Sequence, residues 1–138
     1  ATFFYLVAAG SRAMSYTVKY NQEKNCIMVA VHGELNLPLL KDIAFDVSKI
    51  IDEMGCRFIL NDLREASPTK GASDIYDMPE ASKKAGIVPT VKRALIVGNR
   101  DKDFHFLETV FVNQGNIVKM FANMDDAEVW LLETKKGT

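Results

Sequence analysis

The chain has 138 residues, enough for one domain with a substantial core, and its apolar (48%) and charged (25%) fractions are those of an ordinary globular protein. Its net charge of −1, from 17 basic and 18 acidic residues, leaves no basic surplus to pair with a phosphate backbone, so we expect no nucleic-acid partner. No apolar run approaches the roughly 18 residues that a transmembrane helix needs.

Residues 1–13 differ in character from the rest of the chain. Their apolar run, residues 3–9, has no basic residue before it and is too short to span a membrane, so it resembles neither a secretory signal nor a transmembrane helix. We interpret residues 1–13 as a leader or a segment added for expression, with a native start at Met14 and a single domain over residues 14–138. The alternative is a native segment whose apolar side chains contact a second subunit, a partner or a membrane surface.

Two strands joined by a turn are predicted next. Residues 16–20 (YTVKY) alternate in polarity, which is typical of a strand with one buried face. The polar turn at residues 21–25 then favours antiparallel pairing with a second strand at residues 26–32.

The strongest helix pattern in the chain lies between residues 34 and 55. Asn36 is a good N-cap, Pro38 falls in the first turn, and Gly55 marks the end. The apolar residues recur at spacings of three and four and form one stripe: Leu40, Ile43, Ala44, Val47, Ile50, Ile51 and Met54. The strand predicted after this helix, residues 56–63, therefore runs parallel to the strand before it, as in a βαβ unit.

The sequence after Leu63 is polar and predicts a loop that begins at Arg64. A helical turn is predicted at residues 73–76. A short helix then follows from Asp77 to Gly86, because Asp77 and Glu80 have the spacing of a capping box.

The last third of the chain predicts a strand, a helix, a strand and a helix. The strands are residues 93–98 and 117–122, and Lys119 indicates for the second of them either an edge position or a face open to water. Asp103 is predicted to cap the helix 104–114, and Asn123 to cap a final helix from which Trp130 and Leu131 point inward. The element order is β-β-α-β-α-β-α-β-α, an α/β fold with a mixed, mostly parallel five-stranded sheet and about four helices.

Four stretches carry a resemblance to a known family: LNDLRE, KRALIVG, ETVFVNQG and the closing FANMDDAEVWLLE. Over about residues 16–133 the chain resembles the STAS fold of sulfate transporters and anti-sigma factor antagonists. It more closely resembles the largely uncharacterised bacterial SpoIIAA-like proteins, which group with STAS and with CRAL-TRIO lipid-binding domains. The resemblance implies a non-enzymatic regulatory or binding domain in the cytoplasm, without a cofactor, that acts through a protein partner or a small apolar ligand.

One functional residue of anti-sigma factor antagonists has no clear counterpart here. In those proteins a partner kinase phosphorylates a serine after the equivalent strand, in a sequence close to Asp-Ser-Ser-Gly. Here Leu63 follows Asp62, Pro68 follows Ser67, and the glycine is missing. We therefore assign no phosphosite.

Candidate binding residues lie where the parallel strands end, because ligands of open α/β sheets bind outside the carboxyl ends of the strands. These ends supply His32 with Gly33, the segment from Asn61 to Arg64, and residues 99–101. Asp62 and Arg64 alternate along a strand and share a side, so with Ser67 and His32 they are candidates for contacting a polar ligand or a partner's loop. The alternative is structural: Asp62 caps the following loop and Arg64 pairs with a neighbouring carboxylate.

The helix 104–114 is rich in aromatic residues. Phe104 belongs to its inner stripe, whereas Phe106 lies on the flank. Core packing is the first explanation for both, but the surplus of apolar residues also favours an apolar cavity for a small ligand, or contact with a second subunit in a homodimer.

Catalytic and metal-binding motifs are absent from the sequence. Neither His32 nor His105 has another histidine or a cysteine at ligand spacing, so we expect no metal site, and no phosphate-binding glycine loop or nucleophile elbow is present. Cys26 and Cys56 are interpreted as reduced core thiols, with a disulfide as the alternative. A small enzyme that uses residues 61–64 with His32, and a homodimeric structural module, are the alternatives to a binding domain.

Overall fold

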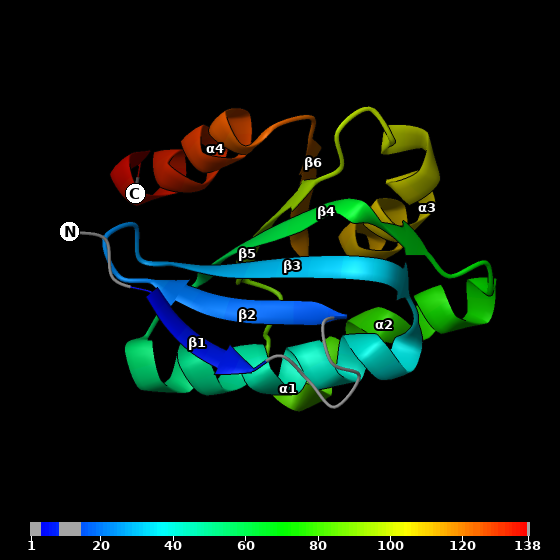
Figure 1. Ribbon diagram of the computed structural model, residues 1–138, viewed down its shortest axis with the longest axis horizontal. Coiled ribbons are helices and arrows are strands. Elements are labelled where there is room, and N and C mark those ends of the chain that lie inside the picture. Colours follow the sequence, from blue (N-terminus) through cyan, green and yellow to red (C-terminus); the bar gives the residue numbers. More distant parts are fainter. Residues whose placement is uncertain (1–3, 9–14, 138) are drawn as a thin grey trace.

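The computed structural model describes residues 4–8 and 15–137 and has an α/β fold (Figure 1). The elements are β1 (Phe4–Ala8), β2 (Tyr16–Asn21), β3 (Cys26–Leu35), α1 (Leu37–Met54), β4 (Phe58–Pro68), α2 (Ala72–Ala85), β5 (Lys92–Ile96), α3 (Asp101–Asn113), β6 (Ile117–Phe121) and α4 (Met124–Gly137). The strands form one sheet in the order β1-β2-β3-β4-β5-β6. The three pairs from β3 to β6 are parallel, and the pairs β1–β2 and β2–β3 are antiparallel.

The sheet confirms the predicted mixed topology and adds one strand to it. The five predicted strands are β2 to β6, and β6, which carries Lys119, lies at one edge as expected. The added strand β1 pairs with β2 at the other edge. Residues 1–3 and 9–14 lie outside the described residues, and the interpretation of residues 1–13 as a leader stays a prediction.

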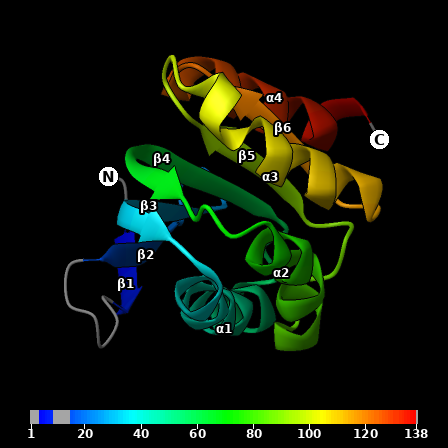
Figure 2. The same ribbon diagram turned by 90° about the vertical axis from the view of Figure 1, so that its right-hand side faces the viewer.

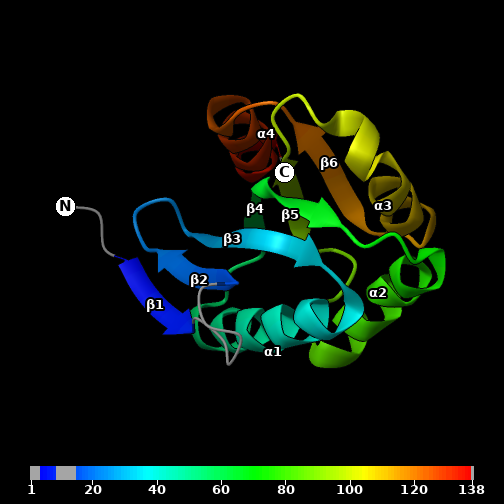
Figure 3. The ribbon, with the colours of Figure 1, turned by 45° about the vertical axis from the view of Figure 1, so that its right-hand side comes forward.

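Two helical layers enclose the sheet. Helices α1, α2 and α3 pack on one face, and α4 packs on the opposite face over the β4–β6 half, as Figures 2 and 3 show from two sides. The side chains of Leu95 in β5 and of Val97 directly after it join the larger core under α1–α3, whereas Ala94 and Ile96 join the smaller core under α4. Because successive strand residues point to opposite faces, Arg93 faces the α1–α3 layer.

The predicted helix ends are confirmed in α1 and α4. The Asn36 side chain accepts a hydrogen bond from the backbone N–H of Leu39 at 3.0 Å, and Gly55 ends α1 in the left-handed conformation with φ = 67°. The Asn123 side chain likewise accepts from the N–H of Asp126 at 2.9 Å. These short-range signals are local, so the sequence alone is enough to read them.

The predicted loop at Arg64 is wrong, because β4 continues to Pro68. The extension pairs with the end of β3, where His32 lies opposite Glu65 and Leu35 lies opposite Pro68. Pairing with a long neighbouring strand satisfies the backbone of this polar segment, so the tertiary context outweighs its local preference for a loop.

The two short helical pieces predicted between residues 73 and 86 are one helix, α2, with Pro79 inside it. A proline inside a helix removes one backbone hydrogen bond, and the capping-box interpretation therefore began a new helix near Pro79. Met78 and Pro79 are both buried, and their packing offsets the lost bond. Gly86 ends the helix, as predicted.

Helix α3 begins at Asp101, not after a cap at Asp103. Arg100 occupies the cap position, and the carboxylate of Asp103 accepts a hydrogen bond from Arg100 Nε at 3.2 Å. The Asp103 side chain thus binds a neighbouring guanidinium instead of the backbone N–H groups at the start of the helix.

The smaller core holds α4 against the sheet. Leu131 is buried there as predicted, whereas Trp130 is half-buried and packs at the margin of this cluster. Lys92 Nζ lies 4.1 Å from the centre of the Trp130 ring, in cation–π geometry. Trp130 therefore anchors α4 to β5, in keeping with its interpretation as a structural residue.

Two further expectations concern the cysteines and the membrane. Cys26 and Cys56 are both buried thiols, as expected for core cysteines. Among the helices that the structure describes, none is both long and apolar enough to cross a membrane.

Candidate functional site

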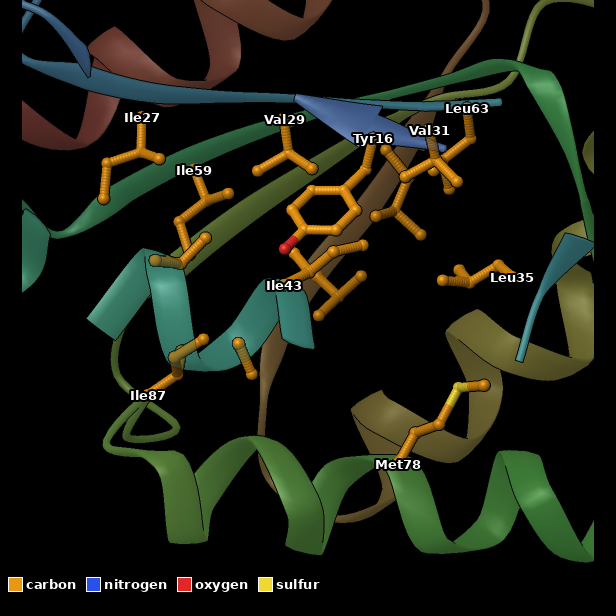
Figure 4. Packing of buried hydrophobic residues seen from close by; sticks show 14 of the residues in the cluster. Tyr16, Ile27, Val29, Val31, Leu35, Ile43, Ile59, Leu63, Met78 and Ile87 are labelled. Carbon is orange, nitrogen blue, oxygen red and sulfur yellow. The ribbon is translucent and has the colours of Figure 1, made fainter. Parts of the chain in front are cut away.

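An apolar cavity of about 70 Å³ lies between the sheet and the layer formed by α1, α2 and α3. Side chains of β3, β4, β5 and β6 form one wall, including Val31 and Leu63, and α2 contributes Met78 from the opposite side. Figure 4 shows Val31 and Leu63 pointing from the sheet toward α1 and α2, with Met78 pointing toward the sheet. One water molecule needs about 10–15 Å³, so the cavity is large for a protein interior, which is normally close-packed.

One charged side chain, Arg93, belongs to the wall of this cavity. It is 6% exposed. Its Nη2 donates to Asn116 Oδ1 at 3.0 Å and to the carbonyl oxygen of Val88 at 3.3 Å, and its guanidinium lies 5.6 Å from the centre of the Phe111 ring. Nε of Arg93 is buried and has no hydrogen-bond partner. A buried N–H without an acceptor is rare in proteins and calls for an explanation.

No carboxylate among the described residues forms an ion pair with Arg93. Its neighbours on the adjacent strands are Ile59 and Val118, which are both apolar. Burial lowers the pKa of Arg93 to about 10, so the guanidinium remains charged at neutral pH. A buried charge without a counter-ion costs a protein several kcal/mol of stability. An anion bound beside Arg93 would therefore stabilise the folded protein.

Asn116 holds Arg93 in place. It is buried at the start of β6, where its Nδ2 donates to the carbonyl oxygen of Phe111 at 3.0 Å and its Oδ1 accepts from Arg93. The sequence reasoning missed both residues. A signal was present for Arg93, because this arginine directly precedes the apolar run at residues 94–97, but nothing in the sequence pairs it with Asn116.

The predicted site residues Asp62 and Arg64 do share a side, where they form an ion pair with each other. Arg64 Nε donates to Asp62 Oδ1 at 2.9 Å, and Arg64 Nη2 donates to Asp62 Oδ2 at 2.8 Å. This two-point contact lowers the pKa of Asp62, with the hydrogen bond from Arg64 as the largest cause. In the structural alternative to a binding role, Arg64 pairs with a neighbouring carboxylate. The structure shows that this carboxylate belongs to Asp62.

Replacing Asp62 with asparagine is expected to lower the free energy of unfolding at neutral pH by less than about 1 kcal/mol, because the ion pair is exposed to solvent. The folded-state pKa of Asp62 is below its unfolded value, so its contribution is complete above about pH 4 and disappears as the pH falls through the folded-state pKa. Urea unfolding of the unaltered chain and of the Asp62→Asn variant at a series of acidic pH values measures the difference in their free energies of unfolding. A difference that grows toward low pH would contradict the assignment.

His32 and Ser67 lie on the surface near this pair. His32 is exposed on β3 where its register with β4 shifts, and Ser67 is exposed on the extension of β4 opposite Glu34. No hydrogen bond joins the described side chains of His32 and Asp62, and neither residue lines the cavity. The alternative of an enzyme called for these two side chains within hydrogen-bond reach in a cleft, and the structure shows no such hydrogen bond between them.

The aromatic candidates on α3 have separate environments. Phe104 is fully buried in the larger core, whereas Phe106 is 39% exposed and meets Tyr76 of α2 edge to face, with ring centroids 5.4 Å apart. Neither ring lines the cavity, but Leu107 and Phe111 of the same helix do. The predicted apolar cavity thus lies beside α3, but other residues of the helix form its wall.

Arg100 joins the carboxyl ends of two strands, which the sequence did not indicate. Its Nη1 donates to the carbonyl oxygens of Ala66 and Arg64 on β4, and its guanidinium lies over the ring of Phe104. This position fixes the start of α3 against β4. Among the described residues no group of three or more histidine, cysteine or acidic side chains is arranged to hold a metal ion.

Comparisons with known proteins give a likeness in structure alone. No family model matches the sequence, and no curated protein matches it. The crystal structure of an uncharacterized protein of the DUF3478 family from Shewanella loihica PV-4, which has a SpoIIAA-like fold, aligns with a TM-score of 0.52 and 14% identity over 95% of each chain. The anti-sigma factor antagonist SpoIIAA in its unphosphorylated form aligns over 100% of each chain, with 13% identity and a TM-score of 0.44, too low to add to the argument.

The order of strands, the helical layers and the likeness to the Shewanella protein agree with one another. At this level of identity the likeness concerns the fold and carries no residue roles. The chain has a SpoIIAA-like fold.

Proposed function

We propose that this chain is a non-enzymatic binding domain that takes up a small apolar ligand between its sheet and the α1–α3 layer. The observation that carries the proposal is the apolar cavity of about 70 Å³ at this position. Protein interiors rarely leave such a space unfilled, because each lost packing contact lowers stability. An apolar ligand that fills the space restores those contacts.

The wall of the cavity suits a ligand better than it suits water. Its side chains come mainly from aliphatic residues, and among the lining residues only Asn61, Ser82 and Arg93 are polar. Asn61 already donates from Nδ2 to the carbonyl oxygen of Ala94 at 3.3 Å. A buried water needs about two to four polar partners, and a wall of this composition offers few.

Native mass spectrometry of protein purified from cells tests the proposal. We expect an extra mass under gentle conditions that disappears on denaturation. Replacing Ala44 in the cavity wall with valine adds two methyl groups to the space and should reduce the bound fraction, whereas alanine at the exposed Phe45 on the outer side of α1 should leave it unchanged. Full retention of the ligand by the Ala44→Val variant would place its binding elsewhere.

A protein partner is the second candidate, and the exposed aromatic pair Tyr76 and Phe106 favours it. The two side chains are 56% and 39% exposed on neighbouring helices. Aromatic residues are enriched in protein interfaces, where they supply contact area at little entropic cost. A single-subunit mass without any ligand would favour this candidate, and a doubled mass would favour a homodimer.

A further inference from the structure

We propose that the ligand of the cavity is an anion with an apolar tail, a short-chain carboxylate whose head group pairs with the guanidinium of Arg93 in the cavity wall. This inference rests on the proposed function, since it names the class of ligand for the same cavity. Three observations carry it: the cavity, the buried cation in its wall, and the absence of a carboxylate ion-paired with that cation among the described residues.

The hydrogen bonds of Arg93 leave part of its guanidinium without a protein acceptor. Nη2 uses its two N–H groups on Asn116 Oδ1 and the carbonyl oxygen of Val88. Nε has one N–H group and no acceptor, although less than a tenth of the residue is exposed. A carboxylate paired with the guanidinium supplies the missing negative charge, and charge-assisted hydrogen bonds of this kind are about twice as strong as neutral ones.

Asn116 and Phe111 orient the guanidinium for this role. Asn116 fixes Nη2 through its Oδ1 and is itself fixed by the carbonyl oxygen of Phe111. The Phe111 ring lies against the guanidinium and also lines the cavity. An arginine held on two sides in this way loses little further freedom when an anion binds, which favours affinity.

The volume of the cavity limits the ligand to a small molecule. An engineered apolar cavity of about 150 Å³ admits benzene, and the space here is about half as large. We therefore expect a carboxylic acid smaller than benzene, of about two to three carbon atoms, with its alkyl group against aliphatic residues such as Leu107 and Val118.

The test compares two probes of nearly equal shape, acetate and acetamide. The first carries a negative charge at neutral pH and the second is neutral. Titrations at matched ionic strength, followed by NMR of the methyl groups that line the cavity, give the dissociation constant of each. We expect the carboxylate to bind about tenfold more tightly than the amide.

Two variants assign the preference to a residue. Replacing Arg93 with methionine keeps an apolar side chain of similar length and should bring the two dissociation constants to the same value. Replacing the exposed Arg64 with methionine removes an arginine outside the cavity and should leave the preference unchanged.

Each contrary result is distinct. If the amide binds as tightly as the carboxylate to the unaltered chain, recognition of the anion is wrong while the proposed uptake of an apolar ligand stands. If the Arg93→Met variant keeps the preference, the assignment to Arg93 is wrong. If neither probe shifts the methyl groups that line the cavity, both the proposed function and this inference fail. The comparison of the two probes on the unaltered chain needs no variant, so it holds even if the Arg93→Met protein does not fold.

Discussion

Replacing Phe104 with alanine is expected to lower the free energy of unfolding by about 3–5 kcal/mol, which is a large part of the ~5–15 kcal/mol typical of a domain. Phe104 is 0% exposed at the first turns of α3, where its ring packs in the core beneath the Arg100 guanidinium. The loss combines the transfer of the ring to water with the cavity that it leaves behind. Urea unfolding measures it through the midpoint and slope of the transition.

Phe106, two residues further along the same helix, is the matched control. Because its ring is 39% exposed, its replacement by alanine should cost about 1 kcal/mol or less. Both residues are predicted binding candidates, and the comparison separates a core residue from a surface residue. Equal losses for the two variants would contradict the placement of Phe104 in the core.

Replacing Asn116 with alanine is expected to destabilise the protein by about 2–4 kcal/mol, because the change withdraws an acceptor from a buried cation. It also removes the donor to the carbonyl oxygen of Phe111. The same substitution in the Arg93→Met background should cost only about 1–2 kcal/mol, since the cation is then absent. Unfolding of the four proteins forms a double-mutant cycle that isolates the interaction.

The cycle tests the state of Arg93 independently of any ligand. We expect a coupling of about 1–2 kcal/mol between Arg93 and Asn116, consistent with a direct buried hydrogen bond. Additive effects would mean that the guanidinium does not depend on Asn116, and that the site is less ordered than the distances indicate. A positive coupling together with equal binding of both NMR probes would assign the pair to stability alone.

Features that depend on neighbouring residues could be predicted from the sequence. The stripe of α1, the caps at Asn36 and Asn123 and the ends at Gly55 and Gly86 all follow from residues within one or two turns of each other. The apolar strands between them then required a mostly parallel sheet with covering helices. Local physics was sufficient here because the side chains that make these signals contact backbone a few positions away.

Features that depend on residues far apart in the chain could not be predicted in this way. Pairing with the end of β3 extended β4 through a polar segment, and packing of Met78 and Pro79 kept α2 continuous through a proline. Arg93 and Asn116 are 23 positions apart, and only the meeting of β5, β6 and α3 brings them together. The cavity depends on the same assembly, because its wall combines strands and helices whose spacing no local pattern specifies.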